Sequence, residues 1–183
     1  WLRRLGGGPG GDVGPIEDMG EDTREDVRYE LNDARGNTVA EGFTALGALS
    51  PSGRSRPFDA GADGLVPAAG AGFVVLQRLA DARAAGHTIH GVIRAVGLAN
   101  DGRAGGLLAP SVAGQVRAMR AAYAGSGLSP EQVALVECHA NGTPVGDQLE
   151  LQSTAAVFAG HPGVALGSLK SNLGHLITAA GVA

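Results

Sequence analysis

Two histidines and a lysine are the residues of this chain best suited to chemistry. His139 opens residues 139–143 (HANGT), a loop of small, amide and hydroxyl residues that follows an apolar run. His175 and Lys170 both lie in residues 167–175 (GSLKSNLGH), a similar loop that follows a second apolar run. Loops that follow neighbouring parallel strands meet at one edge of a sheet. We therefore expect the two imidazoles and the ammonium group to converge.

A convergent set of this kind suits the stabilisation of an enolate or an oxyanion. Neutral imidazoles offer N–H donors to a developing negative oxygen, and the charge of Lys170 strengthens the local field. Asp147 and Glu150 fall at i and i+3 on the helix that follows, where they could hold Lys170 or orient an imidazole. The competing interpretation is that His139 and His175 are core histidines with satisfied hydrogen bonds, and the pattern leaves both open.

The remaining candidate groups are predicted to be structural. Cys138 directly precedes His139, and neighbouring side chains of an extended strand point to opposite faces. A thiolate–imidazolium pair is therefore not expected, and Cys138 is predicted to be buried. His87, His90 and His161 are predicted to be surface or turn residues. The sequence has no metal-ligand spacing, so no metal is expected.

Charge and composition exclude several classes of function. The 183 residues include 14 Lys and Arg against 18 Asp and Glu, without a basic stripe, so nucleic-acid binding is not expected. No apolar run reaches transmembrane length, and the N-terminus lacks the apolar part of a secretory signal. The single cysteine excludes an internal disulfide. We expect a cytoplasmic protein without a membrane partner, and the lack of Met at position 1 suggests a piece of something longer.

Apolar runs and helical periodicity alternate along the chain. Strands are predicted at residues 73–76, 92–96, 133–136 and 164–166, the first and third of them buried. Helices are predicted at residues 79–85, 112–125, 144–159 and 173–183, with Asn172 as N-cap of the last. The third helix is expected to turn four residues inward: Val145, Leu149, Ala156 and Phe158. This alternation favours an α/β layered fold.

The N-terminal residues differ from the rest of the chain. Residues 6–11 (GGGPGG) have the composition of a flexible linker, and residues 12–33 are acidic without an apolar period. A short exposed strand at residues 27–31 is the one element expected there. We expect residues 1–41 to be a poorly ordered segment and residues 42–183 to form the folded part.

Three segments of the chain carry a family resemblance. Residues 139–150 (HANGTPVGDQLE) resemble the H-G-T-G-T-x-x-G-D-x-x-E segment of the β-ketoacyl synthase (ketosynthase) domains of fatty acid and polyketide synthases. Residues 167–183 (GSLKSNLGHLITAAGVA) resemble the family's G-S-x-K-S-N-x-G-H-x-x-x-A-A-G segment. Residues 48–79 are similar to the stretch that precedes both, and the three occur in the family's order.

The resemblance implies a fold, a reaction and partners. The fold would be a thiolase-like αβαβα sandwich of two related halves, of which residues 42–183 would supply mainly the second, truncated at both ends. The full domain would be an acyltransferase that performs the decarboxylative Claisen condensation of acyl and malonyl thioesters in polyketide or fatty acid biosynthesis. Its substrates would ride on the phosphopantetheine of acyl carrier protein, it would need no bound cofactor or metal, and it would form a homodimer.

The resemblance also implies roles for individual residues. His139 and His175 match the two catalytic histidines, which assist decarboxylation of the malonyl group and stabilise the enolate and thioester oxygens. Lys170 matches the family's catalytic lysine. Glu150 matches the glutamate associated with that lysine, and Asp147 the aspartate of the G-D step. Thr143 matches a threonine that contacts the phosphopantetheine arm.

Three departures from the family pattern qualify these roles. Asn141 stands where the family usually has Thr, so one phosphopantetheine contact would be made by an amide. Ala69 replaces the Glu of a G-E-G-A-G turn. The family's nucleophilic cysteine lies in a D-T-A-C-S-S segment that this chain lacks, and Cys138 does not map onto it. We therefore expect the isolated chain to be inactive in condensation. The alternative is a non-catalytic thiolase-like half that pairs with a partner chain, or that binds acyl carrier protein without turnover.

Overall fold

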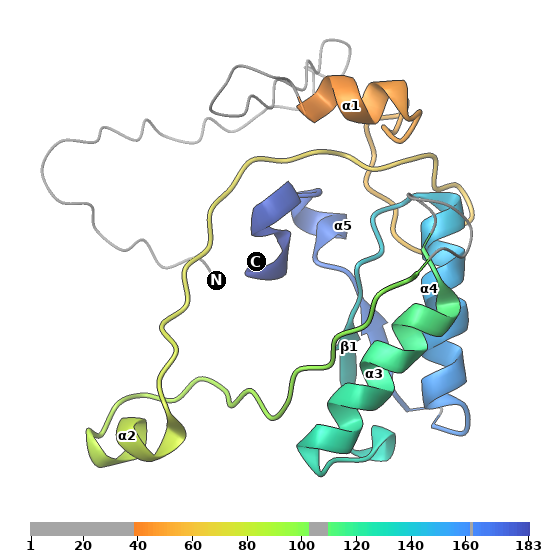
Figure 1. The fold of residues 1–183 in the computed structure, drawn as a ribbon. Helices are drawn as coiled ribbons and strands as arrows, with labels where there is room; N and C mark the ends of the chain where they lie inside the picture. The colour runs from red at the N-terminus through yellow and green to blue at the C-terminus, as the bar shows by residue number, and fades with distance from the viewer. Residues whose placement is uncertain (1–38, 103–109, 162) are drawn as a thin grey trace, which may run out of the picture.

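The computed structural model describes residues 39–102, 110–161 and 163–183 (Figure 1). The linker, acidic segment and short strand predicted before residue 39 lie outside the described residues. Nine elements follow one another in the described parts: α1 (Val39–Ala45), α2 (Leu79–Ala84), α3 (Val112–Ser126), η1 (Pro130–Gln132), β1 (Leu135–Glu137), α4 (Pro144–Phe158), β2 (Ala165–Gly167), α5 (Lys170–Leu173) and η2 (Ile177–Gly181).

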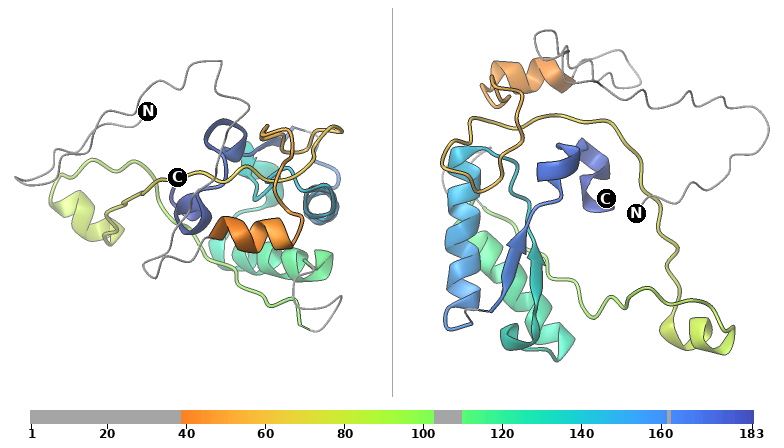
Figure 2. Two further views of the ribbon diagram at one scale, coloured as in Figure 1. Left: turned by 90° about the horizontal axis from the view of Figure 1, so that it is seen from above. Right: turned by 180° about the vertical axis from the view of Figure 1, so that it is seen from behind.

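The strands β1 and β2 form a parallel pair that α4 connects. Leu135 lies opposite Ala165, and Glu137 lies opposite Gly167. Parallel neighbours need a crossover connection, and α4 provides it. Figure 2 shows α3 and α4 side by side next to the strands, with α5 and η2 following β2. The βα alternation predicted from the sequence is therefore present in this part of the chain.

The two long helices were predicted to within one or two residues at each end. The Ser111 hydroxyl accepts a hydrogen bond from the N–H of Gly114 at 3.2 Å and so caps α3, which ends at Gly127 with φ of 69°. Pro144 occupies the first turn of α4. The helices meet through Tyr123 and Phe158, whose rings lie 5.9 Å apart in a T-shaped arrangement.

The buried face of α4 is more polar than the apolar pattern predicts. Phe158 is buried as expected, but Val145 and Ala156 are exposed, so that part of the prediction is wrong. Ser153 and Asp147 are buried instead. The Ser153 hydroxyl donates to the side-chain oxygen of Gln115 on α3, and Asp147 binds backbone amides. Polar side chains reach this face because each finds a hydrogen-bond partner there.

Two predicted strands are absent from the described residues. Residues 73–76 and 92–96 are irregular, and Phe73 and Val75 are 91% and 96% exposed. Figure 1 shows them in a long open path on either side of α2, which forms where the sequence predicts a helix. A strand needs a neighbour for its N–H and C=O groups, and neither described strand pairs with these residues. The strand predicted at 133–136 does form as β1, but Leu135 is exposed rather than buried.

The predicted C-terminal helix is broken near its start. Asn172 lies inside α5 and is not an N-cap, because α5 runs from Lys170 to Leu173 and ends at Gly174, which has φ of 72°. His175 then pairs with a distant segment: its N–H donates to the carbonyl of Val66 at 2.7 Å, and its carbonyl accepts from the N–H of Ala68 at 2.9 Å. This pairing takes the backbone out of the helix and fixes the position of His175.

Residues 49–68 form a loop that contacts both histidine loops. Leu49 forms a β-bridge with Leu65, which is 3% exposed, and the N–H of Gly64 donates to the carbonyl of Gly142 at 2.9 Å. The loop therefore contributes backbone contacts to the two segments that carry His139 and His175. Within the part of the chain that is described, none of the helices has the length and apolarity to span a membrane.

Candidate active site

The strand arrangement brings His139 and His175 together, as the sequence predicts. His139 follows β1, and His175 follows β2 and α5. Because the strands are parallel neighbours, both loops leave the same edge of the pair. The centroids of the two imidazole rings lie 5.4 Å apart, with the ring planes at 76°.

The hydrogen bond to its own loop fixes the tautomer of neutral His175. Nδ1 accepts from the backbone N–H of Ile177 at 2.9 Å. A backbone N–H only donates, so Nδ1 carries the lone pair and the proton of the neutral ring is on Nε2. Partial burial, and then the positive charges of His139 and Lys170, lower the pKa of His175 below its usual 6.5. At neutral pH the ring is therefore an uncharged Nε2–H donor.

His139 is also held neutral. Desolvation lowers the pKa of His139 below 6.5, the charge of Lys170 lowers it further, and the nearby carboxylates of Glu150 and Asp147 oppose the shift in part. Its Nε2 lies 3.4 Å from the side-chain nitrogen of Asn141. The two rings therefore meet as neutral imidazoles.

Lys170 is a buried cation beside the histidine pair. It begins α5, is 8% exposed, and its backbone carbonyl accepts from the Ser55 hydroxyl at 2.6 Å. Its charge acts on both rings, as their lowered pKa values show. Among the described residues, Lys170 forms no ion pair with Asp147 or Glu150. The described residues therefore give no ion pair for the option in which Asp147 or Glu150 holds Lys170, and an association of Glu150 with Lys170 stays a prediction.

Both carboxylates bind the backbone that carries His139. The Glu150 carboxylate accepts from the N–H of His139 at 2.6 Å and of Ala140 at 2.7 Å. The Asp147 carboxylate accepts from the N–H of Asn141 at 3.1 Å and of the next residue, Gly142, at 3.2 Å. Consecutive amides of the loop are thus held by one face of α4. The sequence also suggested that these carboxylates could orient an imidazole. In the structure they hold His139 through its backbone and not through its ring.

Asn141 and Thr143 are hydrogen-bonded to each other. The side-chain oxygen of Asn141 accepts from the N–H of Thr143 at 3.1 Å and from its hydroxyl at 2.7 Å. Asn141 is 8% exposed. Contacts of these two residues with phosphopantetheine stay a prediction. The Thr143 hydroxyl keeps acceptor capacity, whereas a ligand donor would have to compete for the Asn141 oxygen.

Cys138 is buried, as predicted. It is 5% exposed, and burial, followed by the charges of Glu150 and Glu137, raises the pKa of its thiol to about 11. The thiol group lies 3.7 Å from the carbonyl oxygen of Val136. A thiol in this state is not a nucleophile at neutral pH.

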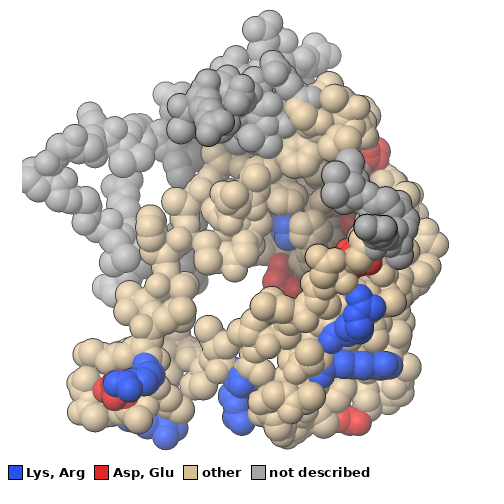
Figure 3. Space-filling model, in the orientation of Figure 1, with Lys and Arg blue, Asp and Glu red and all other residues tan. Residues whose placement is uncertain are grey.

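The other histidines lie away from the pair. His87 and His90 are exposed, and Nδ1 of His87 lies 2.8 Å from the side-chain oxygen of Gln77. His161 follows α4, and its Nε2 lies 3.1 Å from the Glu131 carboxylate. The described residues contain no cluster of metal-ligating side chains. On the face seen in Figure 3, basic and acidic side chains are interspersed, without a field of one sign.

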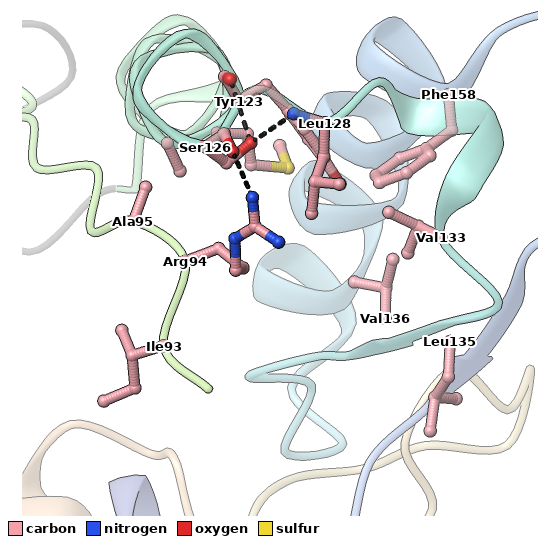
Figure 4. A pocket seen from close by; sticks show the side chains of 12 residues that line it. Ile93, Arg94, Ala95, Tyr123, Ser126, Leu128, Val133, Leu135, Val136 and Phe158 are labelled. Atoms are coloured by element: carbon pink, nitrogen blue, oxygen red, sulfur yellow. Dashed lines mark hydrogen bonds between the residues drawn. The ribbon is translucent and has the colours of Figure 1, made fainter. Parts of the chain in front are cut away.

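An apolar groove of about 340 Å³ lies apart from the histidines, between α3, β1 and residues 93–95. Tyr123, Val136 and Phe158 line it, and Arg94 donates to the carbonyl of Ser126 at 3.3 Å beside it (Figure 4). This groove was not predicted from the sequence. Its lining is mostly aliphatic and aromatic, so it has no chemistry of its own.

The chain belongs to the β-ketoacyl synthase family. Residues 90–183, just over half of the chain, match the family described as "Beta-ketoacyl synthase, C-terminal domain". Residues 32–82 match "Beta-ketoacyl synthase, N-terminal domain". The second match reaches into the segment before residue 42, while the boundary predicted there stays a prediction.

Curated relatives agree with this family. The chain is 45% identical over 146 residues to the mycoketide-CoA synthase of Mycobacterium tuberculosis, covering 77% of this chain and 4% of the relative. It is 44% identical over 141 residues to polyketide synthase PksL of Bacillus subtilis, covering 75% of this chain and 3% of the relative. The chain therefore spans only a small part of the length of these relatives.

Solved ketosynthases share the fold. The ketosynthase from module 6 of the bacillaene synthase of Bacillus subtilis 168 has a TM-score of 0.70 and 36% identity, covering 78% of this chain and 27% of that chain. The ishigamide ketosynthase/chain length factor has a TM-score of 0.72 and 33% identity, covering 78% and 34%. The thiolase-like fold class expected from the sequence is therefore confirmed, and the chain spans about a quarter to a third of these solved chains.

Proposed function

We propose that this chain supplies the histidine–lysine part of a ketosynthase active site. The complete domain would then condense an acyl thioester with a malonyl thioester, both carried on the phosphopantetheine of acyl carrier protein. The observation that carries the proposal is the approach of the neutral rings of His139 and His175 to 5.4 Å beside the buried charge of Lys170. Polyketide synthases among the relatives favour a polyketide pathway over fatty acid synthesis.

In the proposed reaction the malonyl group loses carbon dioxide first. The electron pair of the breaking C–C bond moves onto the thioester oxygen and forms an enolate, which the Nε2–H of His175 would stabilise. The enolate carbon then attacks the carbonyl of the acyl group held on a cysteine. The tetrahedral oxyanion collapses, the new C–C bond remains and the cysteine leaves as thiolate. Lys170 contributes a fixed positive field throughout these steps.

The acyl-accepting cysteine of this reaction is not supplied by this chain. Cys138 is the only cysteine in the sequence, and it is buried with a raised pKa. Covalent transfer needs an accessible thiolate. We therefore propose that the isolated chain forms no acyl-enzyme, whereas decarboxylation, which needs only the enolate-stabilising groups, remains open to it.

The test is to incubate the full chain with malonyl acyl carrier protein and to measure released carbon dioxide, with intact mass spectrometry alongside. We expect release above the protein-free rate and no acyl adduct. His175→Gln should lower the protein-dependent rate by about 10²-fold, the usual effect of removing one oxyanion donor. The matched control is His87→Gln, at an exposed histidine far from the pair. Equal rates for the two variants would contradict the proposal, and an acyl adduct would contradict the inactivity.

A second candidate is a non-catalytic half that pairs with a partner chain. The favouring observation is the apolar residues of 73–76 and 92–96, among which Phe73 and Val75 are more than 90% exposed. Large exposed apolar patches are typical of interaction surfaces. Scattering or native mass spectrometry would show self-association or a complex, and binding of acyl carrier protein without carbon dioxide release would favour this candidate over the first.

A further inference from the structure

The side-chain amide of Asn141 has a defined orientation. One of its two terminal atoms lies 3.1 Å from the backbone N–H of Thr143 and 2.7 Å from the Thr143 hydroxyl. A backbone N–H can only donate, so this atom is the amide oxygen. The amide is 8% exposed and held by two hydrogen bonds, so the nitrogen must be the atom on the opposite side.

That nitrogen lies 3.4 Å from Nε2 of His139. The amide nitrogen has two N–H donors and does not accept, so Nε2 of the neutral ring must carry the lone pair. We propose that Asn141 is a positioning residue that holds His139 as its Nδ1–H tautomer. This is the opposite tautomer to His175, whose Nδ1 accepts from Ile177 and whose proton is on Nε2.

The electrostatic surroundings agree with a neutral ring. The groups that act on His139 are Lys170, Glu150 and Asp147, with His175 in ring contact. Both carboxylates accept from backbone amides of the loop, and among the described residues neither forms a hydrogen bond with the His139 ring. Among the described residues, Asn141 is therefore the side chain that decides which nitrogen of His139 is protonated.

The two histidines are then unlike in what they offer a substrate. His175 presents an N–H donor, whereas His139 presents a lone pair at Nε2 that is covered by the Asn141 amide. If the proposed function holds, a thioester oxygen is recognised first through His175. His139 donates from Nε2 only after its proton has moved from Nδ1 and the Asn141 amide has released the ring. Asn141 would thus determine that His175, and not His139, is the first of the two to donate a hydrogen bond to the substrate.

The decisive variant is Asn141→Asp. It keeps an oxygen for the two Thr143 hydrogen bonds and replaces only the donor that faces His139, so the group beside Nε2 becomes an acceptor. The matched control is Asn100→Asp, which makes the same change of charge at an exposed asparagine whose oxygen accepts from the N–H of Gly102 at 2.7 Å.

The readout is long-range proton–nitrogen correlation NMR of the full chain labelled with ¹⁵N-histidine, above the pKa of both rings. His139→Gln and His175→Gln assign the signals. In the unsubstituted chain we expect His139 with Nδ1 protonated and His175 with Nε2 protonated. Asn141→Asp should move the proton of His139 to Nε2 and raise its pKa by about 1 pH unit or more, since a carboxylate favours the charged ring. The tautomer of His175 should be the same in the Asn141→Asp chain. In the Asn100→Asp chain, both the tautomer and the pKa of His139 should be unchanged.

Either of two results would overturn the inference: an Nε2–H tautomer for His139 in the unsubstituted chain, or a tautomer unchanged by Asn141→Asp. If the variant does not fold, the spectrum of the unsubstituted chain still decides between the tautomers. The measurement contains no substrate, so its failure is separate from a failure of the proposed function, which the carbon dioxide assay reports.

Discussion

Glu150 binds the backbone of His139 and not its imidazole ring, with 2.6 Å between the carboxylate and the His139 N–H. The second carboxylate oxygen accepts from the N–H of Ala140 at 2.7 Å. One side chain therefore satisfies two successive amides of the loop that carries the candidate catalytic histidine. Charge-assisted hydrogen bonds of this kind are about twice as strong as neutral ones. The site is thus positioned by a helix that contributes no group to the proposed chemistry.

Replacing Glu150 with Gln should destabilise the chain. The amide keeps one acceptor but turns a donor toward the second N–H, which leaves that N–H unsatisfied at a cost of about 1–3 kcal/mol. Urea unfolding followed by circular dichroism measures the change. Gln152→Ala, at an exposed position on the same helix, is the control and should change stability by less than about 0.5 kcal/mol. A Glu150→Gln effect no larger than this control would mean that the two hydrogen bonds add little.

Gly142→Ala should be more destabilising than Gly86→Ala. Both glycines have positive φ, 85° and 67°, so both alanines carry the cost of a left-handed backbone, about 1–2 kcal/mol. A Cβ at Gly142 would also lie 2.7 Å from the carbonyl oxygen of Gly64, whereas one at Gly86 meets nothing within 4 Å. The difference between the two unfolding free energies therefore isolates the close approach of the two loops. Equal losses would contradict it.

Stability should fall as the pH is lowered through the usual histidine range. The pKa values of His139 and His175 are lowered in the folded chain, so the unfolded chain binds more protons between those values and about 6.5. The free energy of unfolding therefore rises with pH across this window and levels off above it. His175→Gln should flatten the dependence, and His90→Gln, at an exposed position, should leave it unchanged. The opposite slope would refute the neutral pair.

Cys138 should resist thiol reagents in the folded chain. Its thiol is buried and has a pKa of about 11, so the thiolate is scarce at pH 8. Ellman's reagent should react with one thiol per chain only after denaturant is added. Rapid reaction without denaturant would show that Cys138 is accessible and would reopen the question of a nucleophile.

The sequence predicted the helices α3 and α4 well because their determinants are local. Ser111 and Gly127 bound α3, and Pro144 begins α4, so three of these four ends have a residue with a known preference. Residues 73–76 have the composition of a strand, but a strand also depends on a partner far away in sequence. The same is true of His175, which leaves the helical pattern because it pairs with Val66. No local pattern contains that information.

The candidate site was predicted in part for the same reason. The convergence of His139 and His175 follows from two parallel strands and the loops after them, and this order of elements can be read along the chain. The partners of Glu150 and Asp147 could not be read in this way. Backbone amides have no signature in the sequence, whereas a lysine does. The sequence therefore suggested Lys170 as the partner, and not the backbone amides that these carboxylates bind.

The β-bridge between Pro67 and His175 joins segments separated by more than half of the chain. Closing such a long loop is entropically costly, and contacts of high sequence separation slow the search for the native state. The final backbone position of His175 depends on closing this loop, because its N–H and carbonyl pair with Val66 and Ala68. We therefore expect the histidine pair to reach its final geometry late in folding, so that a signal from the ring contact would report completion of the native topology and not formation of the local helices.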